Sequence, residues 1–261
     1  MAAPLELLDA LTAEGVDTFT FAEAEKMLAR SPTATANVLR RLRSHGLIDR
    51  LGRGRYAIRP FGSLHTSPAT DNLTTAVAAT FSNKPHRIAY LSALSELGLL
   101  THPVRTITVA SVSQVRIAAI SHRPLRVVIE RPATIHLETE VVGRSWRSNL
   151  DRALFECALR LDLTGSVERL AEALVTGVSG THAASIARLA QVFGPKGRAA
   201  ERRLASLVRK LDLPLQLTPD VSARQALIRL DPREREVAWV DETFQVSWHL
   251  QPDELRAVVG S

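Results

Sequence analysis

A chain of 261 residues, with 45% hydrophobic and 23% charged residues, has the composition of a globular protein of one or two domains, which argues against extensive disorder. Its formal net charge of +6 favours an acidic partner, and nucleic acid is a better candidate than anionic lipid. Arginine-rich codon usage would, however, give the same net charge. One cysteine, Cys157, cannot form an internal disulfide or a thiolate metal cluster, and no apolar stretch is long enough to span a membrane. We expect a cytoplasmic protein in which Cys157 packs as a small apolar side chain.

The N-terminal part of the sequence predicts three short helices. Leucines at helical spacing indicate the first over residues 4–13, and a second is expected over residues 22–30. Ser31-Pro32 begins the third helix, because serine is a favourable N-cap and proline fits the first helical position. We expect this third helix to end near His45, before Gly46.

Two strand-like runs after the third helix predict a β-hairpin, which we call the wing. Residues 47–51 and 56–58 form its strands, and Gly52-Arg53-Gly54-Arg55 joins them. The next residues are rich in proline, glycine, serine and threonine, a composition typical of a linker. The expected organisation is a winged helix-turn-helix over residues 1–61, a linker over 62–71 and a second domain over 72–261.

The third helix has two chemically different faces when it is wound at 100° per residue. Thr35, Val38, Leu39 and Leu42 form an apolar stripe that should pack on the first two helices. The opposite face offers arginine, asparagine and hydroxyl groups, which match base edges in the major groove of DNA. With the helix start and the wing, this face supplies the predicted DNA-binding residues, which are Ser31, Thr33, Ala36, Asn37, Arg40, Arg41, Arg43, Arg50, Arg53 and Arg55.

The charge of this region is concentrated. Residues 30–59 contain eight arginines and a single acidic residue, Asp49. Codon usage alone would scatter arginines over solvated faces, and it does not predict a capped helix followed by a basic hairpin. The pattern therefore favours DNA binding over a merely solvated surface.

The rest of the chain predicts an α+β domain without the regular βα alternation of a nucleotide-binding sheet. Helical periodicity is expected over residues 73–81, 88–97, 150–161, 167–178, 183–192 and 199–211. Strands are expected over residues 106–112, 125–130, 134–142, 226–230, 237–240 and 244–250. The clearest break between helices is Gly194-Pro195-Lys196-Gly197. The expected fold class is α+β, with an N-terminal winged helix-turn-helix followed by a larger mixed α+β domain.

Several short segments together resemble AbiEi-type antitoxins. They are Phe19 to Ala24, Val38 to Ile48, Gly52 to Ile58, Tyr90 to Leu100, Arg105 to Val109, Ile186 to Ala190 and Val246 to Leu250. The resemblance implies an antitoxin of a type IV toxin-antitoxin system whose winged helix binds double-stranded DNA of its own promoter and represses it. It also implies that the C-terminal domain counters a nucleotidyltransferase-like toxin, a separate chain encoded beside it. This sequence lacks a Gly-Ser followed by Asp-x-Asp, the carboxylates with which such a transferase holds magnesium, as expected for the antitoxin.

Motifs for catalysis are weak, and we expect no enzyme activity, cofactor or metal. The eight histidines include no pair at metal-ligand spacing, and neither glycine-rich segment completes a phosphate-binding motif. A two-metal nuclease of the PD-(D/E)xK kind requires an acidic residue on a strand, then one residue of any type, then a lysine. Glu236-Val237-Ala238 has alanine in place of that lysine. Ser179 or Ser185 with His182 is ordinary composition for a helix start, because no G-x-S-x-G elbow exists.

Two alternatives to an antitoxin and autorepressor stay open. One is a stand-alone winged-helix transcription factor whose C-terminal domain senses a ligand or dimerises. The other is a cryptic magnesium-dependent nuclease that the winged helix delivers to DNA.

Overall fold

The computed structural model describes residues 2–14, 16, 18–52, 54–58, 73–81, 84–120, 123–221 and 226–259, with side chains from Glu6 onwards. The chain divides into two compact units, each of which is described by itself. Unit 1 comprises Met1–His86, Val109–Ile135 and Val141–Trp146, and unit 2 comprises Arg87–Thr108, His136–Glu140 and Arg147–Ser261. The linker expected over residues 62–71 lies outside the described residues, so the division into domains at 1–61 and 72–261 remains a prediction.

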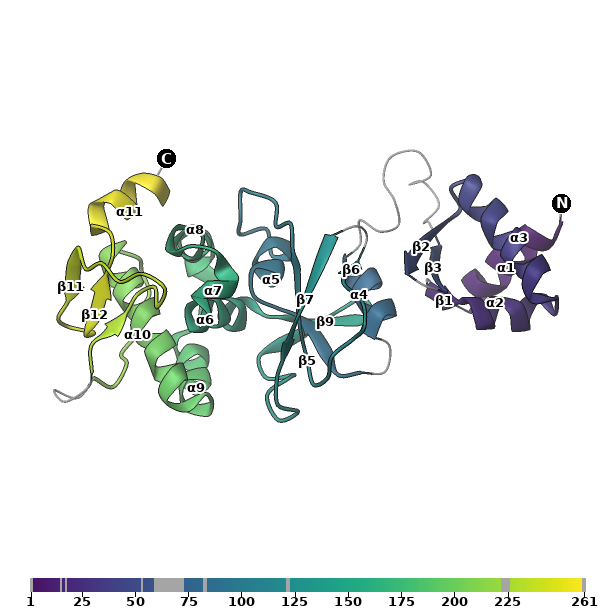
Figure 1. Ribbon diagram of the computed structural model, residues 1–261. Helices are drawn as coiled ribbons and strands as arrows, with labels where there is room; N and C mark the ends of the chain where they lie inside the picture. Colours follow the sequence, from purple (N-terminus) through teal and green to yellow (C-terminus); the bar gives the residue numbers. More distant parts are fainter. Residues whose placement is uncertain are drawn as a thin grey trace. The chain divides into compact units, whose positions relative to one another are not determined.

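Unit 1 begins with a winged helix-turn-helix, as predicted (Figure 1). Its elements are α1 (Ala2–Ala13), β1 (Thr18–Thr20), α2 (Phe21–Leu28), α3 (Pro32–Ser44), β2 (Ile48–Gly52) and β3 (Arg55–Ile58). The strands form an antiparallel sheet in the order β1-β3-β2. Strand β1 was not predicted, because three residues are too few to show an alternating pattern.

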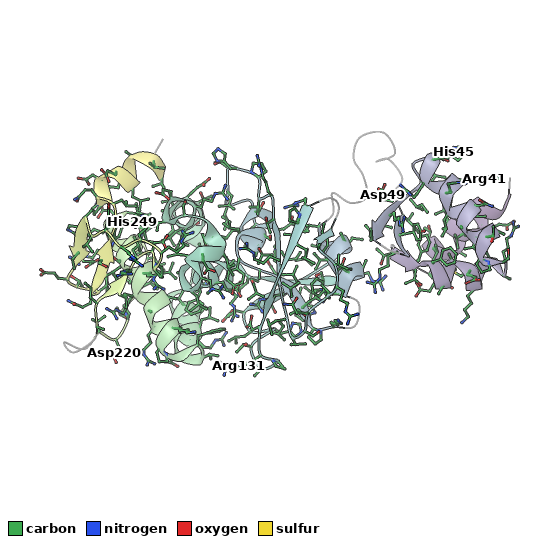
Figure 2. The ribbon with its side chains drawn as sticks, in the orientation of Figure 1. Arg41, His45, Asp49, Arg131, Asp220 and His249 are labelled. Carbon is green, nitrogen blue, oxygen red and sulfur yellow. The ribbon has the colours of Figure 1, made fainter. Side chains whose placement is uncertain are left out.

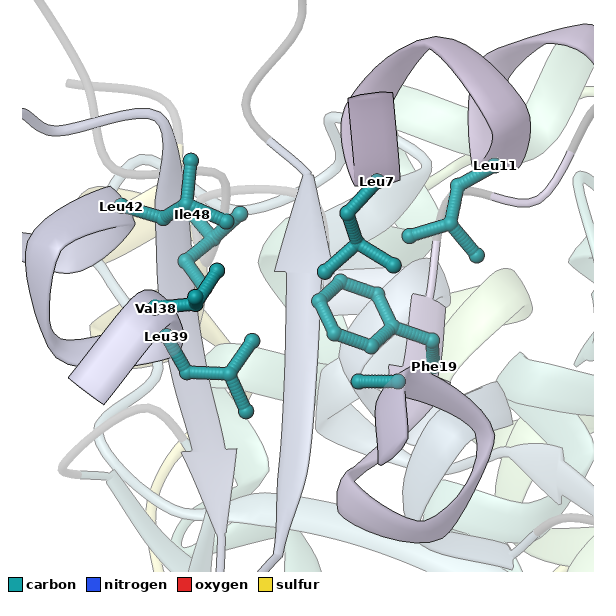
Figure 3. Packing of buried hydrophobic residues seen from close by; sticks show 8 residues of the cluster. Leu7, Leu11, Phe19, Val38, Leu39, Leu42 and Ile48 are labelled. Atoms are coloured by element: carbon teal, nitrogen blue, oxygen red, sulfur yellow. The ribbon is translucent and has the colours of Figure 1, made fainter. Parts of the chain in front are cut away.

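The core of the winged helix joins all of these elements (Figure 3). Leucines of α1 lie beside Phe19, and the apolar residues of α3 lie beside Ile48. Fully burying one such leucine contributes about 1.5–3 kcal/mol, so this cluster fixes how α3 is held. Its buried members are Leu7, Leu11, Phe19, Ala24, Val38, Leu39, Leu42 and Ile48.

A six-stranded sheet follows, in the order β6-β7-β5-β4-β9-β8. Its strands are β4 (His86–Ile88), β5 (Ile107–Ser111), β6 (Ala119–Ile120), β7 (Arg123–Ile129), β8 (Thr139–Val142) and β9 (Ser145–Ser148). Helix α4 (Leu73–Phe81) precedes this sheet, and α5 (Leu91–Glu96) lies between β4 and β5 in the chain. The expected helix over residues 73–81 is therefore confirmed.

Helices dominate the remainder of unit 2, with a small three-stranded sheet in the order β10-β12-β11. The helices are α6 (Leu150–Leu159), α7 (Leu161–Thr164), α8 (Val167–Gly177), the 3-10 turn η2 (Val178–Gly180), α9 (Ala183–Val192), α10 (Gly194–Lys210) and α11 (Pro252–Val259). The strands are β10 (Ile228–Arg229), β11 (Trp239–Asp241) and β12 (Val246–Trp248). In the described part of the chain, no helix combines the length and apolar character that a membrane span requires.

Two predicted elements of the middle region were wrong in part. Residues 88–97 were expected as one helix, but the chain forms β4 through Ile88 and starts α5 only at Leu91. All of β4 is buried, and periodicity cannot distinguish a short buried strand from a buried helix. Of the strand expected over residues 134–142, only Thr139–Val142 is extended, because Thr134 and Glu138 lie in turns.

Three features nearer the C-terminus also differ from expectation. Residues 194–197 open α10 instead of separating helices, because Pro195 occupies the first helical turn, where its missing N–H costs nothing. Gly197 packs against α9: an added Cβ would lie 2.5 Å from the carbonyl oxygen of Ala190. Helix α11 and strand β9 were not predicted at all.

Unit 2 buries a cluster of charges that the sequence analysis did not identify. The Glu156 carboxylate is 1% exposed and pairs with both Arg87 and Arg152, whose side chains are also buried. It also accepts hydrogen bonds from the Ser148 hydroxyl at 3.0 Å and the Tyr90 backbone N–H at 3.2 Å. Burial raises the pKa of Glu156, but the two arginines lower it by more, so the carboxyl has a pKa below its ordinary value.

Candidate nucleic-acid interface

Helix α3 separates an apolar face from a polar face, as its sequence predicts. The buried residues of this helix are Thr35, Val38, Leu39 and Leu42, which are the four members of the predicted stripe. All the buried side chains therefore lie on one side of the helix, and the other side is free for solvent or a ligand.

Both ends of α3 are fixed by local interactions. Ser31 is the N-cap, and its hydroxyl accepts a hydrogen bond from the Ala34 N–H at 3.4 Å, with Pro32 in the first helical turn. At the other end, the His45 N–H donates to the Arg41 carbonyl, and Gly46 adopts a left-handed φ of 68°. The sequence predicted this start and this end, and the structure confirms them.

The predicted DNA-binding residues of α3 are all exposed. Figure 2 labels Arg41 and His45 near the C-terminal end of this helix. The exposed predicted residues are Ser31, Thr33, Ala36, Asn37, Arg40, Arg41 and Arg43. Among the described residues, no carboxylate forms an ion pair with Arg40, Arg41 or Arg43, so this face presents three uncompensated positive charges.

The three predicted arginines of the wing are not alike. Arg50 on β2 is exposed, whereas Arg53 lies outside the described residues. Arg55 on β3 is half-buried, and its Nη1 atom is buried without a hydrogen-bond partner in the described structure. Strand pairing sets Arg55 opposite Thr20 of β1, and its side chain lines a cavity with Glu23. This placement depends on β1, which was not predicted from the sequence.

A capping box at the start of α2 is a second local feature that the sequence analysis missed. The Thr20 hydroxyl accepts from the Glu23 N–H at 3.2 Å, and the Glu23 carboxylate accepts from the Thr20 N–H at 2.6 Å. The signal was present in the sequence as Thr-x-x-Glu before an apolar run.

Two side chains that could support catalysis, Asp241 and Cys157, are buried in the fold. Asp241, the last residue of β11, is buried and accepts hydrogen bonds from Ser206 at 2.8 Å and Arg209 at 3.1 Å. The described residues contain no group of three or more His, Cys, Asp or Glu side chains that could hold a metal ion. Cys157 is fully buried, as predicted, and burial raises the pKa of its thiol.

Comparisons with known proteins agree with this arrangement. The crystal structure of the RV2827C protein from Mycobacterium tuberculosis matches with a TM-score of 0.69, covering 100% of this chain and 96% of that chain at 17% identity. At this identity the likeness shows a shared fold and nothing more. No curated protein gives a significant sequence match. Residues 6–59 match the family described as transcriptional regulator, AbiEi antitoxin, which confirms the expected resemblance for the winged helix.

Proposed function

We propose that this protein is a DNA-binding transcriptional autorepressor and an antitoxin of a type IV toxin-antitoxin system. The observation that carries the proposal is the exposed face of α3, where Asn37, Arg40 and Arg41 stand opposite a buried apolar stripe. The match of residues 6–59 to AbiEi antitoxin regulators supports the same function.

Each part of the interface has a distinct proposed role. Arg40 and Arg41 reach guanine O6 and N7, and Asn37 pairs with adenine N6 and N7 in the major groove. Ser31 and Thr33 lie at the N-terminus of α3, where hydroxyls and backbone N–H groups bind phosphate oxygens. The remaining proposed contacts have less specific roles: Ala36 allows close approach to the bases, and Arg43, Arg50, Arg53 and Arg55 bind the DNA backbone.

Binding to the protein's own upstream DNA tests this assignment. Fluorescence anisotropy with the wild type and with Arg40→Ala/Arg41→Ala should reveal a loss of about 1–3 kcal/mol for each bidentate base contact, together with lower selectivity over scrambled DNA. The matched control is Arg198→Ala/Arg235→Ala, which removes two exposed arginines from unit 2 and should leave affinity within about twofold. Equal affinity of the wild type and the α3 variant would refute the proposed interface.

The antitoxin role needs its own experiment. The proposed partner is a nucleotidyltransferase-like toxin in a separate chain, and the AbiEi match is the basis for proposing it. Expression of the adjacent gene should stop growth, and co-expression of this protein should restore it even with Arg40→Ala/Arg41→Ala. Toxicity that persists in the presence of this protein would refute the proposed antitoxin role, and the proposed repressor role would be unaffected.

A transcription factor that senses a ligand is the second candidate, favoured by a cavity of unit 2. The cavity has a volume of about 480 Å³ and is lined by the end of α10 and the segment after it, including Leu213, Leu215, Leu217, Phe244 and Arg209. Six of the ten lining residues are apolar, and the polar ones include both Arg209 and Asp212, so the cavity suits a small amphipathic molecule. A thermal-shift screen that raises Tm with such a compound, and changes DNA affinity, would favour this function over the antitoxin.

A further inference from the structure

The net positive charge of the protein is confined to one unit. Unit 1 contains 15 lysines and arginines against 9 acidic residues, whereas unit 2 contains 18 of each. The whole net charge of +6 therefore belongs to unit 1. Lysine and arginine make up a similar share of both units, so the imbalance comes from the smaller number of acidic residues in unit 1 and not from arginine-rich codon usage.

Part of this excess lies outside the winged helix. The other segments of unit 1, residues 73–86, 109–135 and 141–146, carry six basic residues against one acid, Glu130. Four of the basic side chains are exposed at or near the strands β5, β6 and β7. They are Lys84, Arg116, Arg126 and Arg131.

Three of these residues gather at the β6 edge of the large sheet. The Lys84 ammonium donates to the Gln114 carbonyl at 3.0 Å, which holds it against the segment that carries Arg116. Strand β6 pairs antiparallel with β7, and the hydrogen bond from Leu125 N to Ala118 O continues this pairing before β6. Arg116 and Arg126 are thereby brought to the same end of the hairpin. We call Lys84, Arg116 and Arg126 the edge cluster.

The edge cluster lacks carboxylate partners. In the described part of the chain, none of its three cations forms an ion pair, whereas many surface arginines of unit 2 do. Examples are Arg147 with Glu140 at 2.6 Å and Arg160 with Asp162 at 2.8 Å. Exposed cations without carboxylate partners, one on β7 and two in the segments beside it, suit the closely spaced phosphates of a duplex.

From this arrangement we propose that the edge cluster is a second DNA-binding surface, which contacts backbone phosphates beside the sequence read by α3. The inference rests on the proposed function, because a second contact matters only if the winged helix binds DNA. Both surfaces belong to one chain, so binding by α3 raises the effective concentration of DNA at the edge cluster and its contacts add to affinity. The cluster has no apolar or amide groups, so it adds affinity without sequence selectivity.

The length of the DNA probe tests the inference. We would compare a short duplex limited to the selected site with one extended by about 15 base pairs on each side, using the wild type and Lys84→Ala/Arg116→Ala/Arg126→Ala. The wild type should gain affinity on the longer duplex, and the variant should lose that gain. Between 50 and 200 mM salt, the affinity of the wild type for the longer duplex should also fall more than that of the variant. The additional loss should be about three- to fourfold for each phosphate contact. Arg105→Ala/Arg198→Ala/Arg235→Ala removes three exposed charges from unit 2 as a matched control.

The outcomes separate this inference from the proposed function. If Arg40→Ala/Arg41→Ala abolishes selective binding while the edge variant matches the wild type on both duplexes, the edge cluster does not bind DNA and the α3 interface stands. If the wild type does not select its upstream DNA, the proposed function fails first. Charged side chains also protect sheet edges from pairing with other chains. A variant that self-associates in sedimentation, with unchanged DNA binding, would assign the cluster to that role and overturn the inference.

Discussion

The two units use the same residue type, arginine, in opposite ways. In unit 2, many arginines pair with carboxylates at the surface or bury their guanidinium groups against carboxylates and carbonyls. Arg203, for example, donates to the carbonyls of Arg229 and Ala158. In unit 1, the exposed arginines of α3 have no such partners among the described residues. Arginine content alone therefore says little about DNA binding, and the partners of each guanidinium say much more.

This contrast predicts that arginines and their partners in unit 2 control stability, while those of the α3 face control DNA affinity. Surface residues without partners change unfolding free energy by no more than about 0.5 kcal/mol when truncated. Buried charged pairs behave differently, because removal of one partner leaves the other desolvated and uncompensated.

The largest expected effect is at the buried cluster of unit 2. Glu156→Ala leaves Arg87 and Arg152 buried without their carboxylate, so the free energy of unfolding should fall by about 3–5 kcal/mol. Urea unfolding followed by circular dichroism measures the change. The matched control is Glu236→Ala, which removes an exposed carboxylate and should cost less than about 0.5 kcal/mol. Similar midpoints for the two variants would contradict the idea that this cluster organises unit 2.

A smaller effect is expected at an arginine that pairs with a buried carboxylate from the surface. Arg233 donates to both carboxylate oxygens of Asp231, at 3.0 Å from Nε to Oδ1 and 2.5 Å from Nη2 to Oδ2. Asp231 is 3% exposed, so Arg233→Ala should cost about 1.5–3 kcal/mol. DNA affinity should stay within about twofold of the wild type, and a larger loss would break the division of roles between the units.

The cost of Arg233→Ala should also depend on pH. Burial raises the pKa of Asp231, but the hydrogen bonds and charge of Arg233 lower it by more, so its pKa is below the ordinary value. A carboxylate of this kind stabilises the fold above its unfolded pKa, about 4, and loses that contribution as the pH falls through the folded value. The difference between wild type and variant should therefore be full at pH 7 and smaller at pH 3. A difference that grows toward low pH would mean that Asp231 is not the partner that matters.

The sequence predicted local features of the winged helix well and long-range ones poorly. The stripe and caps of α3 depend on residues within four positions of one another, so periodicity and capping rules were enough. Arg87 and Glu156 are 69 residues apart, and nothing in either local sequence indicates that they meet. The half-buried position of Arg55 was not predicted for the same reason, since it depends on the pairing of β3 with β1.

The smallest effect we predict concerns a carboxylate of unit 1 that is used for a helix start. Thr20→Ala removes the hydroxyl that caps the Glu23 N–H, and it should cost about 1 kcal/mol in urea unfolding. Glu23→Gln keeps an oxygen that can accept from the Thr20 N–H, so it should cost less than Thr20→Ala. If Glu23→Gln instead lowers the free energy of unfolding more than Thr20→Ala does, the negative charge of Glu23 matters more than its hydrogen bond. The carboxylate would then act as a counter-charge within unit 1, and the contrast between the two units would be narrower than the ion pairs indicate.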